Sequence, residues 1–147
     1  MAKYSDTGAI RKILATYKRI AAVGISENIL LPSSAVPRYL KAHGFEIIPV
    51  NPKLRKWEGL KAYGDLEQIP GNVDIVLNFL AVEHLMGLAK AAVKIKAKVL
   101  WAGEGVVSKE AALYGKKHHL TVIMGRCIMK EHRLLNSKSK RKKVPCW

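Results

Sequence analysis

The sequence predicts an α/β fold, a single Rossmann-like doubly wound domain of about five parallel strands with helices on both faces. Short apolar runs alternate along the chain with segments that repeat apolar residues at helical spacing, which is typical of a parallel sheet covered by helices. The chain has 147 residues, 49% of them hydrophobic, enough for one domain with its own core. We expect residues 1–135 to form this domain and 136–147 to form a basic tail.

The first helix and the first strand are predicted in the N-terminal part of the chain. From about Thr7 to Lys18, apolar residues recur on one helical face between basic residues. Ile20 to Val23 is a compact apolar run, typical of a parallel strand buried on both faces. Gly24 ends this strand and permits a tight turn into the next helix.

The second helix and the second strand follow this turn. Ser33 or Ser34 is expected to cap the helix, and Gly44 is expected to end it. Residues 45–50 form the second predicted strand. The pair Asn51–Pro52 ends that strand, because proline cannot donate a hydrogen bond to a neighbouring strand.

The rest of the chain repeats the same alternation. A loop over residues 53–71 is expected to contain one helical turn between Tyr63 and Pro70. Ser108 is expected to cap a later helix. The remaining strands are predicted at residues 73–79, 98–101 and 120–124, and the remaining helices at 84–97, 108–117 and 128–135.

The charge of the chain favours a polyanionic partner. The formal net charge is +15, from 26 basic and 11 acidic residues, and removing the five basic residues of the tail still leaves +10. Such a charge suits either a small phosphorylated ligand or nucleic acid. No apolar run approaches the roughly 20 residues that span a membrane, and no signal-peptide pattern begins the chain. We therefore expect a soluble cytoplasmic protein.

In sheets of this kind, ligands bind beyond the carboxyl ends of the strands, where the strand order reverses. The turn after the first strand leads into a helix N-terminus, whose amides and dipole favour an anion. Lys53 and Arg126 are expected at neighbouring strand ends, where their charges could neutralise further phosphates. The expected binding residues are Gly24, Ile25, Ser26, Ser33, Asn51, Pro52, Lys53, Phe79 and Arg126.

Several common sites are not favoured by the sequence. A dinucleotide site needs three glycines in the first turn and an acidic residue at the end of the second strand. Here the turn has only Gly24, and the strand ends in Asn51–Pro52. The P-loop pattern is absent. Cys127, Cys146 and five scattered histidines provide neither a disulfide framework nor the spacing of a metal site.

Short blocks of sequence point to one family. The blocks are Ala22-Val-Gly24-Ile-Ser26, Pro32-Ser33, Tyr39-Leu40, Gly44-Phe45, Pro49-Val50-Asn51-Pro52-Lys53, Val73-Asp74, Trp101, Gly105-Val106-Val107, Glu110-Ala111-Ala112, Arg126-Cys127-Ile128 and Glu131-His132. In this order and spacing, over residues 8–135, they resemble the small single-domain CoA-binding proteins, which are similar to the CoA-binding domain of the succinyl-CoA ligase alpha subunit. The resemblance implies a Rossmann-like fold that binds coenzyme A, with the diphosphate over the Gly24–Ser26 turn and the adenosine near Asn51–Lys53.

Three functions remain open. Binding of coenzyme A or an acyl-CoA without catalysis is favoured, because no nucleophile lies next to a general base in the sequence. A small enzyme acting on an acyl-CoA or another nucleotide would have only Cys127, Glu104 and the histidines to use. A nucleic-acid-associated protein would use the basic tail. Cys127 is interpreted as a small buried apolar residue rather than a redox group.

Overall fold

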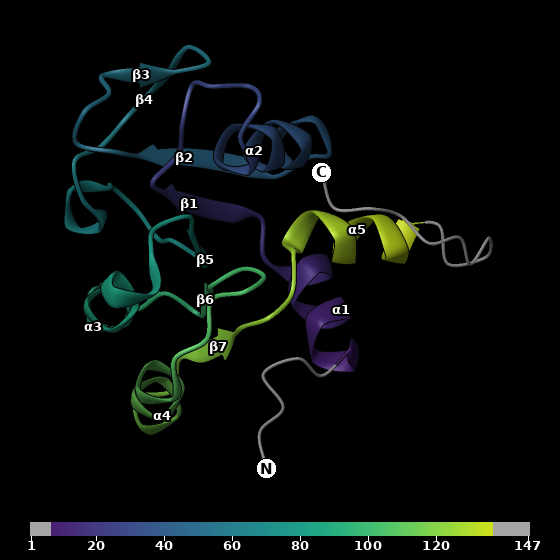
Figure 1. Ribbon diagram of the computed structural model, residues 1–147, viewed down its shortest axis with the longest axis vertical. Helices are drawn as coiled ribbons and strands as arrows, with labels where there is room; N and C mark the ends of the chain where they lie inside the picture. The colour runs from purple at the N-terminus through teal and green to yellow at the C-terminus, as the bar shows by residue number, and fades with distance from the viewer. Residues whose placement is uncertain (1–6, 137–147) are drawn as a thin grey trace.

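The computed structural model describes residues 7–136 and confirms the doubly wound α/β prediction. Five parallel strands form one sheet in the order β2-β1-β5-β6-β7 (Figure 1). The strands are β1 (Arg19–Val23), β2 (Glu46–Val50), β5 (Ile75–Asn78), β6 (Val99–Trp101) and β7 (Thr121–Ile123). The predicted basic tail lies outside the described residues, apart from Asn136 at the end of the last helix. Within residues 7–136, no helix is long and apolar enough to cross a membrane.

A single further residue, Tyr63, extends the sheet beyond β2. Its amide donates a hydrogen bond to the Pro49 carbonyl at 2.9 Å, and its carbonyl accepts one from the Asn51 amide at 2.8 Å. Val50 and Tyr63 are therefore paired in parallel. Counted from this edge, the strand order is 3-2-1-4-5-6, the order of nucleotide-binding Rossmann sheets.

The segment predicted as a loop contains a small hairpin that the sequence analysis missed. Strands β3 (Lys56–Trp57) and β4 (Leu60–Lys61) pair antiparallel. Glu58 and Gly59 join them with φ of 52° and 78°, as in the two-residue turns that suit hairpins. Strands of two residues are too short to show a periodic pattern. The expected helical turn is present as the 3₁₀ segment η1 (Leu66–Gln68).

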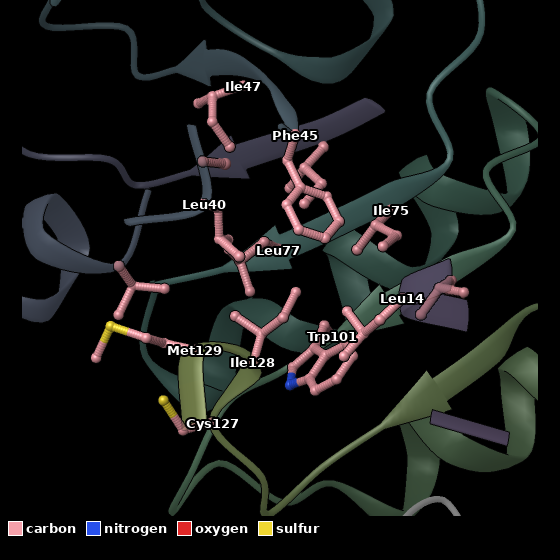
Figure 2. Packing of buried hydrophobic residues seen from close by; sticks show 14 of the residues in the cluster. Leu14, Leu40, Phe45, Ile47, Ile75, Leu77, Trp101, Cys127, Ile128 and Met129 are labelled. Carbon is pink, nitrogen blue, oxygen red and sulfur yellow. The ribbon is translucent and has the colours of Figure 1, made fainter. Parts of the chain in front are cut away.

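Helices cover both faces of the sheet. On one face lie α1 (Thr7–Thr16), α2 (Pro32–Ala42) and α5 (Ile128–Asn136), and their apolar residues share a core with β1, β5 and β6 (Figure 2). On the other face lie α3 (Leu85–Lys94), which follows the 3₁₀ segment η2 (Val82–His84), and α4 (Lys109–Lys117). Trp101 is fully buried in the first core, and its indole N–H donates to the Arg126 carbonyl at 2.8 Å.

The two predicted helix caps have different outcomes. Ser108 caps α4, since its hydroxyl accepts a hydrogen bond from the Ala111 amide at 3.1 Å. The prediction for Ser33 or Ser34 is wrong, because α2 begins at Pro32 after Leu31 and has no side-chain cap. Proline needs no cap at this position, since its φ is preset and it has no N–H to satisfy.

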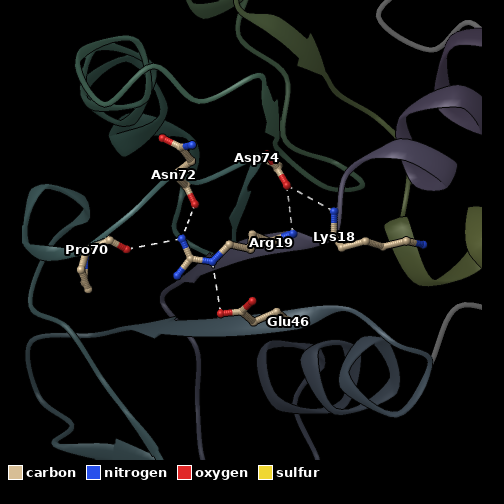
Figure 3. A network of polar contacts seen from close by, with 6 residues as sticks. All are labelled: Lys18, Arg19, Glu46, Pro70, Asn72 and Asp74. Atoms are coloured by element: carbon tan, nitrogen blue, oxygen red, sulfur yellow. Dashed lines mark hydrogen bonds and ion pairs between the residues drawn. The ribbon is translucent and has the colours of Figure 1, made fainter.

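A polar network fixes the amino ends of three strands. The Arg19 guanidinium pairs with Glu46 at 3.1 Å and donates to the Asn72 carbonyl (Figure 3). The Asp74 carboxylate accepts hydrogen bonds from the backbone amides of Lys18 at 3.3 Å and Arg19 at 3.2 Å. These contacts join β1, β2 and the start of β5 at the end of the sheet opposite the expected site.

Aromatic and histidine side chains join α2 to α5. The Tyr39 hydroxyl and His132 Nδ1 are 2.7 Å apart in a hydrogen bond, and His43 stacks on Tyr39 with ring centres 4.0 Å apart. Burial lowers the pKa of His132, and the nearby charges of His43 and Lys18 lower it further. Burial also raises the pKa of Tyr39. The contact between α2 and α5 therefore favours a neutral His132.

Candidate functional site

A cavity opens where the strand order of the sheet reverses. β1 lies between β2 and β5. The connection after β1 leads through α2 to β2, and the connection after β5 leads through α3 on the other face to β6, which makes the carboxyl ends of these strands the expected ligand position. The cavity has a volume of about 580 Å³ and lies at the carboxyl ends of β1 and β2, next to α3. Its lining includes the polar or charged residues Asn51, Lys53, Asp65 and His84 and the glycines Gly24 and Gly87.

Gly24 provides a bare backbone turn at the end of β1. Its φ is +86°, a conformation that residues with a side chain rarely adopt. A Cβ at this position would lie 2.9 Å from Leu80 Cδ2. The Gly24 amide is held by a 2.9 Å hydrogen bond to the Val50 carbonyl. The positive φ therefore requires glycine at this turn, and Gly24 lines the cavity beside Leu80.

The next expected residues shape the turn mainly through their backbone. Ile25 has no exposed surface, so its side chain belongs to the core. The Ser26 amide donates to the Ser33 carbonyl at 3.0 Å, and the Ser26 hydroxyl accepts a bond from the Asn28 amide at 3.0 Å. Trp57 donates its indole N–H to the Ser26 carbonyl at 2.8 Å. The hairpin that carries Trp57 thus holds the loop between β1 and α2.

Asn51 connects the ends of β1 and β2. Its side-chain nitrogen donates to the Ile25 carbonyl at 2.8 Å, and its side-chain oxygen accepts from the Lys53 amide at 2.8 Å. Pro52 and Lys53 are exposed and line the cavity together with Asn51. Among the described residues of this lining, Lys53 is the only lysine or arginine. Asn51 thus positions the loop that carries the positively charged Lys53 side chain.

Among the residues that line this cavity and were not expected from the sequence are Asp65, His84 and Gly87. Asp65 caps η1, because its carboxylate accepts a hydrogen bond from the Glu67 amide at 2.9 Å. Pairing of Tyr63 with β2 brings Asp65 to the cavity, so a carboxylate is present although β2 itself ends without one. The only sequence signal for Asp65 was its position before a helical turn.

Arg126 lies far from Lys53 and Asn51. The prediction that Lys53 and Arg126 lie at neighbouring strand ends is wrong, because β2 and β7 are the opposite edges of the five-stranded sheet. Four strand spacings of about 4.8 Å separate these edges, roughly 19 Å. The Arg126 guanidinium instead pairs with Glu131 on α5 at 3.2 Å. The order of the strands along the chain does not show that the last strand, β7, lies at the edge opposite β2.

Phe79 lines a second cavity of about 340 Å³ at the ends of β5 and β6, on the side of α2. Leu80 lines both cavities. Cys127 is also in this lining and is buried, as expected, but it is disulfide-bonded. The interpretation of Cys127 as a simple apolar residue is therefore incomplete. Within the part of the chain that the structure describes, no cluster of three or more His, Cys, Asp or Glu residues could hold a metal ion.

Comparisons with known proteins show the family and the fold of this chain. The profile of the family described as CoA binding domain matches residues 18–133. The uncharacterised protein YneT of Bacillus subtilis (strain 168) is 41% identical over 123 residues, which cover 84% of this chain and 91% of YneT. A hypothetical protein from Pyrococcus horikoshii OT3 superposes with a TM-score of 0.87 at 32% identity, covering 93% of this chain and all of that one. A dinucleotide-forming acetyl-coenzyme A synthetase of Ca. Korarchaeum cryptofilum shares the fold with a TM-score of 0.63 at 21% identity, over 71% of this chain and 25% of that chain.

Proposed function

The chain belongs to the CoA binding domain family, and from that premise we propose that it binds coenzyme A in the cavity at the ends of β1 and β2, without catalysing a reaction. The observation that carries this proposal is the Gly24 turn at the base of a 580 Å³ cavity. Cavities of several hundred cubic ångströms suit ligands of nucleotide size. The family resemblance and the local geometry therefore point to the same end of the sheet.

The electrostatics of the cavity rim support a phosphorylated ligand. Lys53 lines the cavity, and the adjoining hairpin segment carries the exposed basic residues Arg55, Lys56 and Lys61. Among the described residues, no group accepts a hydrogen bond from the amides of Ile25 or Ser33. Amides at a turn and at a helix N-terminus are suitable donors to phosphate oxygens. We place the diphosphate over the Gly24–Ser26 turn and the adenosine near Lys53.

The absence of catalysis in this proposal rests on the contacts of the titratable groups. Asp65 is engaged by the Glu67 amide. Among the described residues, no hydrogen bond joins His84 or Glu104 to a hydroxyl, thiol or amine side chain. A general base acts on a nucleophile within hydrogen-bond reach. A chain that binds CoA without turning over its thioesters is therefore the expected outcome.

The test is a comparison of two phenylalanine substitutions on α3. A Cβ at Gly87 would meet nothing within 4 Å, so Gly87→Phe should occupy the cavity without disturbing the fold. Lys90 is exposed on the same helix and does not line the cavity, so Lys90→Phe is the matched control. We expect calorimetry to show at least tenfold weaker CoA binding in Gly87→Phe and unchanged binding in the control.

Two further measurements decide the ligand. Mass spectrometry of small molecules that co-purify with the protein should find coenzyme A. Calorimetry against CoA, NAD and ATP should rank CoA first. NAD is the competing ligand to test, because Asp65 lines the cavity and a carboxylate can bind the ribose hydroxyls of NAD. Tighter binding of NAD than of CoA would overturn the proposal. Equal affinities of the two phenylalanine variants for CoA would place the ligand elsewhere.

A further inference from the structure

The second cavity is mostly apolar and shares one lining residue, Leu80, with the cavity proposed for CoA. Its volume is about 340 Å³, and the residues that dominate its lining are Val36, Leu77, Phe79, Ala102, Val106 and Ile128. Leu80 forms a wall of both cavities and lies next to the Gly24 turn. A ligand whose diphosphate lies over that turn can therefore extend past Leu80 into the second cavity.

The polar groups of this cavity are few and mostly engaged. The buried Asn78 donates to the carbonyls of Leu80 at 3.0 Å and Ala102 at 3.4 Å, and its side-chain oxygen accepts from the Leu80 amide at 2.9 Å. Cys127 is disulfide-bonded and offers no thiol. The walls therefore favour an apolar group over one that needs new hydrogen bonds.

Glu104 supplies the only charged side chain among the described residues that line this cavity. It is exposed, between Gly103 and Gly105, whose φ values are +96° and +77°. A second carboxylate in the cavity would meet this like charge and would find no lysine or arginine in the described lining. Like charges brought together in a partly enclosed site repel more strongly than in water.

We infer that the second cavity holds the acyl group of a CoA thioester and selects short uncharged acyl groups over those that end in a carboxylate. This inference rests on the proposed function, since the CoA part must bind first. It describes binding alone and includes no reaction of the thioester. Free CoA would leave the apolar walls without an acyl partner and should bind more weakly than its short acyl esters.

Calorimetry of the full chain with free CoA, acetyl-CoA, butyryl-CoA and succinyl-CoA tests this selection. Each methylene buried between acetyl and butyryl should tighten binding by about fourfold. Succinyl has as many carbons as butyryl but ends in a carboxylate, and it should bind at least tenfold more weakly than butyryl. Butyryl-CoA binding no tighter than free CoA would overturn the acyl site while leaving the proposed function intact.

The role of Glu104 has its own variant and control. Glu104→Gln removes the charge at an exposed position and should reduce the ratio of butyryl-CoA to succinyl-CoA affinity severalfold. Glu110→Gln, at an exposed position on α4 outside the cavity lining, should leave the ratio unchanged. An unchanged ratio in Glu104→Gln would refute the charge selection. Failure of every CoA compound to bind would refute the proposed function and this inference together.

Discussion

Gly87 and Gly115 are helical glycines whose replacement by alanine should have opposite effects on stability. Alanine at an interior helix position gains about 0.5–1 kcal/mol over glycine, because glycine loses more backbone entropy on folding. At Gly87 on α3, the added Cβ would meet nothing within 4 Å. We therefore expect Gly87→Ala to raise the free energy of unfolding by about 0.5–1 kcal/mol.

At Gly115 on α4, the added Cβ would lie 2.5 Å from Val122 Cγ2 and 2.7 Å from the Leu120 carbonyl oxygen. The carbonyl is backbone and cannot turn away as a flexible side chain can. Overpacking of this kind costs about 1–3 kcal/mol, more than the gain in helix propensity. Gly115→Ala should therefore be destabilised by about 1 kcal/mol, the difference between the midpoints of these opposing effects.

Urea unfolding followed by circular dichroism measures both variants against the parent chain. The two free energies of unfolding should differ by about 2 kcal/mol, with similar slopes against urea concentration. If Gly115→Ala proved as stable as Gly87→Ala, then α4 would not pack on β7 as closely as the structure has it.

Three other variants test the remaining contacts. Because the pKa of His132 is lowered in the folded chain, the unfolded chain binds a proton more readily at this residue. The folded chain should therefore have its full stability above about pH 6.5 and lose stability as the pH falls below that value. Thermal unfolding at several pH values should show a smaller loss of stability in His132→Gln. Asn51→Asp cannot donate to the Ile25 carbonyl and should lose about 1–3 kcal/mol of stability in urea unfolding, whereas an unchanged midpoint would show that this bond is dispensable. Arg126→Gln should change the CoA affinity measured by calorimetry by less than twofold, because Arg126 pairs with Glu131 at the edge of the sheet opposite β2. A tenfold loss of affinity would show that the guanidinium contacts the ligand.

The sequence predicted well those features that depend on local pattern. The apolar runs at β1 and β2 and the helical stripes were found close to their observed positions, since buried strands and amphipathic helices leave a periodic signal. The Gly24 turn was also predicted, because only glycine adopts its φ without strain. The general rule for parallel sheets led us to expect a site beyond the carboxyl ends of the strands, and a cavity lies there.

The sequence could not show which distant segments meet. Asp65 reaches the cavity only because Tyr63 pairs with β2, and a single paired residue has no periodicity to detect. Pro32, rather than Ser33, begins α2, because a preset φ replaced the expected side-chain cap.

The sequence by itself determined the fold class, the glycine turn and the family resemblance, since each depends on residue types at short spacing. Only the tertiary structure decided that Lys53 and Arg126 lie at opposite sheet edges and that Leu80 separates two cavities. The physical reason is that strand order and cavity shape come from packing between segments far apart in the chain. The periodicity of a helix or strand shows which of its faces is buried, but it does not show which other segment packs against that face.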